Sequence, residues 1–139
     1  PGVSFMMVST AGELCSCNKR SVYQPTTESR YRVVLQSFSK RMIKDCQIIA
    51  VPLHNDDLKR GSIDKNVSER VAQIRYELEK TRLNFPINQK TLALTYIDGL
   101  SNSETFFMQA AYESKKFPCM FVGGSAGGKL DFQNTYIFD

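Results

Sequence analysis

Two short apolar segments separated by one helix-length segment constrain the fold of this 139-residue chain most strongly. Thr91–Ile97 is rich in β-forming residues and ends at Asp98-Gly99, and Phe117–Val122 is a second apolar run. Between them, Ser101 and Glu104 have the spacing of a capping box, which predicts that a helix begins there. Because a helical crossover returns the chain in its original direction, we expect the two strands to be parallel neighbours.

The rest of the chain extends this unit to an α/β fold. Apolar residues at helical spacing predict a second helix from about Asn66 to Arg82, with an inward face made of Val67, Val71, Ile74 and Leu78. The helix that begins near Ser101 is expected to turn Phe107, Ala110 and Ala111 inward and to end near Lys115. Further strands are expected at Val3–Val8, Tyr31–Phe38, Cys46–Leu53 and Asn134–Phe138. The expected class is a mixed sheet that contains one β-α-β unit and carries packed helices.

Composition excludes several classes of function. The net charge of +4 comes from basic residues that are scattered among acids, which gives little support to nucleic-acid binding. The longest apolar runs fall far short of the roughly 20 residues of a membrane-spanning helix, so no membrane contact is expected. Four cysteines without repeated spacing suit reduced thiols and a cytoplasmic location, and the pair Cys15 and Cys17 supplies too few ligands for a structural zinc site.

The stretch Gly-Gly-Ser-Ala-Gly-Gly-Lys at 123–129 satisfies two enzyme motifs at once. It contains the G-x-S-x-G of a nucleophile elbow around Ser125 and the G-x-x-x-x-G-K of a phosphate-binding loop ending at Lys129. Both motifs require a helix immediately afterwards, whereas Phe132, Thr135 and Tyr136 favour a strand. We therefore expect a non-enzymatic protein, and a serine hydrolase using Ser125 ranks third among the functions considered.

Small and polar residues gather instead where three expected strands end. If these ends converge, their hydroxyls, backbone N–H groups and carboxylates could bind a small polar molecule. A carboxylate of Glu13 or Asp98 would bind a cationic group, and the amides of Gly124–Ala126 would bind an anionic one. The candidate ligand-binding residues are Ser9, Thr10, Gly12, Glu13, Asp98, Gly99, Gly123, Gly124, Ser125 and Ala126. His54, the sole histidine, is a weaker candidate for a haem ligand, and its other interpretation is a turn residue after Pro52.

The order of these motifs resembles the amino-terminal FIST domain over about Val3 to Phe138. The resemblance rests on Ser9-Thr10-Ala11-Gly12-Glu13, on Asp98-Gly99-Leu100-Ser101 after its strand, and on Gly123-Gly124-Ser125-Ala126-Gly127 followed by Phe132, Thr135 and Phe138. Val34–Ser39 and Ala50–Leu53 add to it.

The resemblance implies a sensory module of a signal-transduction protein that binds a small ligand such as an amino acid, with no cofactor. An alternative that it implies is a haem-based nitric oxide sensor. Its expected partner is an effector domain of the parent protein: a chemoreceptor, a histidine kinase or a cyclic-nucleotide enzyme. It also implies that residues 1–139 are one FIST N-type domain that lacks its first elements and the FIST C-type domain that normally follows.

Overall fold

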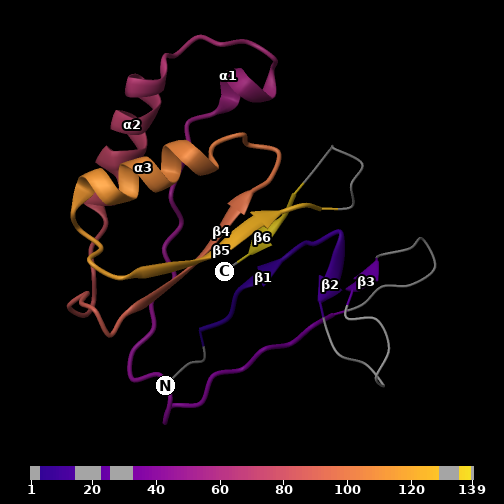
Figure 1. The fold of residues 1–139 in the computed structure, drawn as a ribbon, viewed down its shortest axis with the longest axis vertical. Helices are drawn as coiled ribbons and strands as arrows, with labels where there is room; N and C mark the ends of the chain where they lie inside the picture. Colours follow the sequence, from indigo (N-terminus) through magenta and orange to yellow (C-terminus); the bar gives the residue numbers. More distant parts are fainter. Residues whose placement is uncertain (1–3, 15–22, 26–32, 129–134, 139) are drawn as a thin grey trace.

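The expected β-α-β unit forms the centre of the molecule. It consists of β4 (Leu92–Asp98), α3 (Glu104–Ser114) and β5 (Met120–Ala126). The two strands are parallel and in register from the pair Leu92 and Met120 to the pair Asp98 and Ala126. The computed structural model describes residues 4–14, 23–25, 33–128 and 135–138 (Figure 1).

The second expected helix is α2 (Val67–Lys80), and local sequence chemistry fixes where it begins. The Asn66 side chain accepts a hydrogen bond from the Glu69 amide at 3.0 Å. In return, the Glu69 carboxylate accepts one from the Asn66 amide at 2.9 Å. This reciprocal capping box satisfies two N–H groups that the first turn of a helix leaves without partners.

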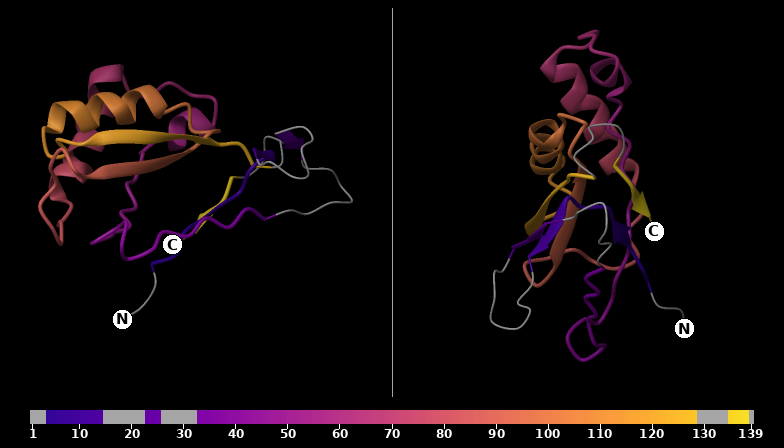
Figure 2. Two further views of the ribbon diagram at one scale, coloured as in Figure 1. Left: turned by 60° about the horizontal axis from the view of Figure 1, so that its bottom comes forward. Right: turned by 90° about the vertical axis from the view of Figure 1, so that its right-hand side faces the viewer.

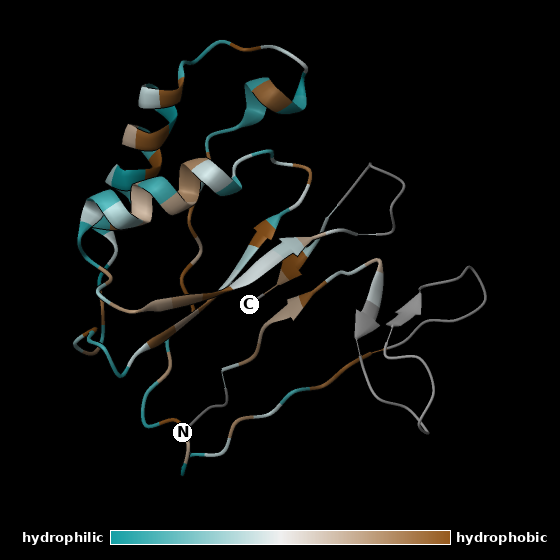
Figure 3. Cartoon of the chain, viewed as in Figure 1, coloured by the Kyte–Doolittle hydropathy of each residue, from teal (hydrophilic) through white to brown (hydrophobic). Residues whose placement is uncertain are grey.

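A single apolar core lies between the two long helices and the parallel strands. Helices α2 and α3 cover the same face of the β4–β5 pair (Figure 2). Apolar residues recur along α2 at helical spacing, with polar residues between them (Figure 3). The buried apolar residues of this core are Val71, Ile74 and Leu78 from α2, Ile97 from β4, and Phe107, Ala110 and Ala111 from α3.

The opposite face of the parallel pair is open. Side chains alternate between the two faces of a strand, so every second residue of β4 and β5 points away from the helices. The large apolar side chains on this open face are between 41% and 67% exposed: Leu92, Leu94, Tyr96, Met120 and Val122.

The remaining strands form two short antiparallel pairs. β1 (Met7–Val8) pairs with β6 (Ile137–Phe138), so two segments far apart in the sequence lie side by side. β2 (Gly12–Leu14) pairs with β3 (Tyr23–Pro25) in a hairpin that the polar sequence there did not predict. The α/β class with both parallel and antiparallel pairs is confirmed, and the strands of the described residues fall into three two-stranded ladders.

Two expected strands are wrong. Residues 33–38 of the segment Tyr31–Phe38 are exposed and belong to no ladder, and Cys46–Leu53 belongs to none either. Val51 and Leu53 pack against the core from an irregular segment. A β-forming sequence becomes a strand only where another strand offers hydrogen-bonding partners, and the described residues offer none here.

The inward face of α2 also differs from the expectation. Val67 is 54% exposed because it lies in the first turn, before the helix reaches the core. Arg70, which is not among the residues expected on the inward face, is buried. Its partner Asp57 lies in α1 (Asp56–Lys59), a one-turn helix where the sequence predicted only a turn.

Candidate functional site

A small cavity opens between the first half of α3 and the carboxyl-terminal half of β5. Its volume is ≈ 220 Å³, below the roughly 300–1,000 Å³ of pockets for drug-sized ligands. Polar groups come from Glu104, Ser125 and Thr95, and the remaining wall is apolar side chain or glycine backbone. The complete lining is Thr95, Ile97, Glu104, Met108, Phe121, Val122, Gly123, Gly124 and Ser125.

Ser125 and Glu104 meet at this cavity. The Ser125 hydroxyl donates a hydrogen bond of 2.6 Å to Oε1 of Glu104. The expected capping box between Ser101 and Glu104 is wrong, because α3 begins after Ser103, whose side chain makes no capping bond. Ser101 is buried and accepts the Ser103 hydroxyl at its carbonyl oxygen instead, at 2.8 Å. Glu104 is thus the site residue that sequence reasoning missed, since its spacing from Ser101 had assigned it to the helix cap.

The glycines expected in a loop lie inside β5. The strand continues through Gly123, Gly124 and Ser125 to Ala126, so these residues form the wall of the cavity as a strand rather than as a turn. A Cβ atom on Gly123 would lie 1.7 Å from the carbonyl oxygen of Thr95 on β4. Gly123 therefore permits the close approach of the two strands, which no other residue type would allow.

Asp98 and Gly99 lie beside the end of β5, as the parallel pairing predicts. The Gly99 amide donates to the carbonyl oxygen of Ala126 at 3.0 Å and extends the ladder by one bond. The Asp98 carboxylate lies 3.2 Å from Nζ of Lys59 and accepts the Leu100 amide at 3.0 Å. Asp98 is thus ion-paired within the protein, and none of Asp98, Gly99 and Ala126 lines the cavity.

The amino-terminal motif approaches this edge but does not enter the cavity. A Cβ on Gly127 would lie 3.7 Å from Cβ of Ala11, so the end of β5 and the turn after β1 are adjacent. The Ser9 hydroxyl accepts the Tyr136 amide at 2.8 Å, which ties it to β6. Thr10 and Gly12 lie outside the lining, and the side chain of Glu13 lies outside what the structure describes. The three motifs therefore converge in backbone position, while only the β5 motif contributes to the cavity.

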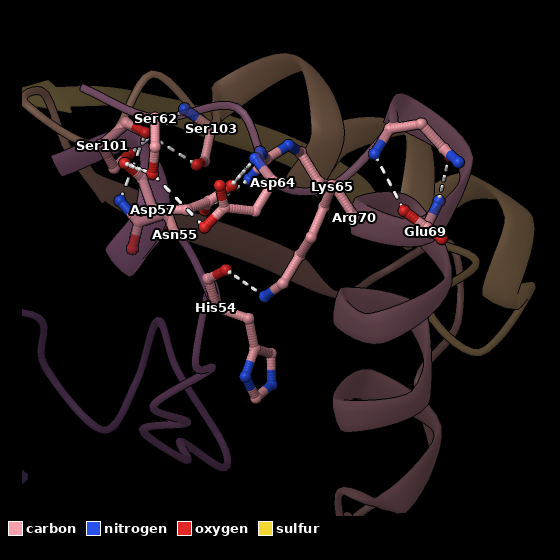
Figure 4. A network of polar contacts seen from close by, with 11 residues as sticks. His54, Asn55, Asp57, Ser62, Asp64, Lys65, Glu69, Arg70, Ser101 and Ser103 are labelled. Carbon is pink, nitrogen blue, oxygen red and sulfur yellow. Dashed lines mark hydrogen bonds and ion pairs between the residues drawn. The ribbon is translucent and has the colours of Figure 1, made fainter. Parts of the chain in front are cut away.

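A buried polar network anchors α1 next to the same edge (Figure 4). The Arg70 guanidinium donates two hydrogen bonds to the Asp57 carboxylate, one from Nη1 at 3.0 Å and one from Nη2. The Asp64 amide donates to Asp57 as well, at 3.0 Å. The hydrogen bonds from Arg70 hold the pKa of Asp57 far below its usual range, against the opposing effect of burial.

The network reaches the start of α3 through Asn55. Its side-chain amide donates to the Ser101 carbonyl oxygen at 3.2 Å. Since Lys59 of the same short helix pairs with Asp98, α1 is bonded both to the end of β4 and to the turn before α3. The position of the cavity wall near Glu104 thus depends on long-range bonds to residues 55–59.

His54 lies away from the cavity and is bound elsewhere. Its Nε2 is 3.3 Å from Oε1 of Glu77, whose other oxygen lies 2.9 Å from Nζ of Lys80. No group of three or more metal-binding side chains occurs in the described parts of the chain. Because His54 does not line the cavity, it does not fit the axial ligand of a haem held there.

The described part of the two enzyme motifs lacks the geometry that a nucleophile elbow requires. Ser125 lies in a strand opposite Ile97, and not at a sharp turn from a strand to a helix. Lys129 of the phosphate-loop motif and the Cys15–Cys17 pair lie outside the described residues. None of the described helices is long and apolar enough to cross a membrane.

Comparison with known proteins identifies the family. A family model described as the FIST N domain matches residues 1–139, which is the whole chain. No significant match is found among curated proteins or among solved structures. The chain belongs to the FIST N domain family, a sensory domain of signal-transduction proteins.

Proposed function

We propose that this domain senses a small polar ligand such as an amino acid, which it binds without chemical conversion in the cavity between α3 and β5. The observation that carries the proposal is the cavity itself, at the carboxyl-terminal half of a parallel strand pair, where ligands of α/β sheets commonly bind. Its volume of ≈ 220 Å³ suits a molecule smaller than a typical drug.

Ligand binding must also change the state of the protein to produce a signal. A ligand shifts a conformational equilibrium only if it binds the two states with different affinity. The cavity wall combines α3 with β5, and α3 is bonded to α1 through Asn55 and Ser101. A ligand that draws Glu104 and β5 together would alter these contacts, and an effector domain of the parent protein would respond to the change.

Thermal-shift screening of the twenty amino acids against the intact protein tests the proposal. A ligand that binds only the folded state raises the apparent stability, by about 2.7 kcal/mol at 100 times its dissociation constant. Replacing Ser125 by alanine removes one hydroxyl from the cavity and should weaken binding by roughly 2- to 10-fold, the value of one hydrogen bond.

The matched control is Ser68→Ala, which removes an exposed hydroxyl from the first turn of α2. Calorimetric titration should give it the affinity of the unchanged protein. If none of the amino acids shifts the unfolding temperature or releases heat, amino-acid sensing by this cavity is disproved.

A further inference from the structure

We infer that Glu104 makes this cavity selective for ligands that carry an ammonium or guanidinium group on a small apolar body. The inference rests on the proposed function, and it assigns the recognition of charge to a residue other than Asp98 or Glu13. Three features of the described residues support it: an unpaired carboxylate, a neighbouring carboxylate that is already neutralised, and an apolar wall.

Glu104 places a carboxylate in the cavity, and none of the described residues is its basic partner. Its Oε1 accepts the Ser125 hydroxyl at 2.6 Å, which fixes the direction of the side chain. In the described parts of the chain, no Lys, Arg or His forms an ion pair with it. The remaining lone pairs of this carboxylate are thus available to N–H donors of a ligand.

Asp98 cannot serve in the same way. Nζ of Lys59 lies 3.2 Å from one of its oxygens, and the Leu100 amide donates to the other at 3.0 Å. A cationic ligand at Asp98 would therefore have to displace Lys59, whereas at Glu104 it would displace no charged group of the described residues. This difference favours Glu104 as the residue that binds the cation.

The rest of the cavity suits an apolar body. Met108 from α3 and Phe121 from β5 contribute apolar side chains to the lining, and Val122, whose side chain points to the open face of the strand pair, lies beside them. The hydrogen bond between Ser125 and Glu104 is exposed, and the apolar side chains beside it lower the local dielectric below that of bulk water, which strengthens the attraction between a carboxylate and a cation. The amino-terminal end of α3 carries a partial positive charge of about +0.5, which offsets only part of the charge of Glu104.

Three compounds that share a 3-methylbutyl chain test this selectivity on the intact protein. They are leucine, 3-methylbutylamine, which lacks the carboxylate, and 4-methylpentanoic acid, which lacks the ammonium group. By calorimetric titration, leucine or the amine should bind at least 10-fold more tightly than the acid. Glu104→Gln keeps the size of the side chain and an acceptor for Ser125 but removes the charge, so this preference should fall to less than 3-fold.

The control variant is Glu113→Gln, which removes an exposed carboxylate from the last turn of the same helix. It should keep the preference for the amine. Because the measured quantity is a ratio of affinities within one variant, partial unfolding of Glu104→Gln would lower both affinities and leave the ratio interpretable. The unfolding temperature of each variant is recorded alongside.

Three results would overturn the inference while leaving the proposed function in place. The first is an acid that binds within 10-fold of the better amine-bearing compound. The second is a Glu104→Gln variant that keeps the preference. The third is binding of a different amino acid without any binding of leucine or the amine. Failure of all twenty amino acids and all three test compounds would instead remove the proposed function together with the inference.

Discussion

Gly123 shows how a single residue fixes the distance between two strands. A Cβ at this position would overlap the Thr95 carbonyl oxygen, while a Cβ on the next residue, Gly124, would meet no atom within 4 Å. Neither glycine has a positive φ, so alanine is compatible with both backbone conformations. We expect Gly123→Ala to lower the free energy of unfolding by about 1–3 kcal/mol or more through overpacking. Gly124→Ala should leave it unchanged or raise it by up to about 1 kcal/mol. Urea unfolding of both variants measures the difference, and equal stabilities would contradict the close approach of β4 and β5.

Asp57 makes stability depend on pH. Arg70 lowers its pKa in the folded protein, below the value of about 3.9 of an unfolded chain. The carboxylate therefore stabilises the fold fully above about pH 4, and this contribution is lost as the pH falls toward the folded pKa. Asp57→Asn should lower the unfolding temperature at pH 7, because Arg70 stays buried without its ionic partner. It should also flatten the dependence on pH below 4.

The neighbouring carboxylate Asp56 provides the control for this prediction. It is exposed and lies one residue away in the same short helix. Thermal unfolding between pH 2 and pH 7 should give Asp56→Asn nearly the profile of the unchanged protein. An Asp57→Asn variant as stable as Asp56→Asn at pH 7 would show that the buried pair does not support the fold.

Among the helices, α2 contacts the core with only part of its apolar face, because its first turn lies before the core begins. Ile74 is completely buried in the middle of the helix, whereas Val67 is 54% exposed in the first turn. Ile74→Ala should cost about 2–5 kcal/mol of unfolding free energy, because it leaves a cavity between α2, α3 and β4. Val67→Ala should change it by no more than about 0.5 kcal/mol. Denaturant titration of the two variants measures whether the helix contacts the core only after its first turn. Similar losses of unfolding free energy in both variants would place Val67 in the core.

The described parts of the molecule consist of one packed unit, in which α2 and α3 cover β4 and β5, and two peripheral strand pairs. Its buried apolar cluster comes from α2, α3 and β4, and Phe121 of β5 packs against it. Met7, Ile137 and Phe138 in β1 and β6 are exposed, so that pair gains little from burial. Because exchange of an amide requires its hydrogen bond to open, amides of α2, α3, β4 and β5 should exchange with deuterium more slowly than those of β1 and β6. Mass-spectrometric hydrogen exchange tests this order, and equal protection of the two groups would mean that the peripheral pair unfolds together with the core.

Features that depend on neighbours along the chain could be predicted from the amino-acid sequence. Asn66 and Glu69 cap α2 within one turn, and the period of Val71, Ile74 and Leu78 gives the helix its buried face. The parallel pairing of β4 and β5 follows from the length of the crossover between them, so the meeting of Asp98 with the end of β5 was predictable. The same local patterns carried the resemblance to the FIST family.

Tertiary structure alone decided which partners the polar and β-forming residues found. The spacing of Glu104 from Ser101 suited a helix cap equally well. Glu104 accepts a hydrogen bond from Ser125 because β5 lies beside the start of α3. Ligand binding by Asp98 stays a prediction, and nothing in the sequence indicated that α1 would bring Lys59 to its carboxylate. Residues 46–53 have the composition of a strand and lack a strand to pair with among the described residues. In each case the outcome depends on a hydrogen-bonding or ionic partner distant in the sequence, and periodicity and spacing carry no information about where such a partner will lie.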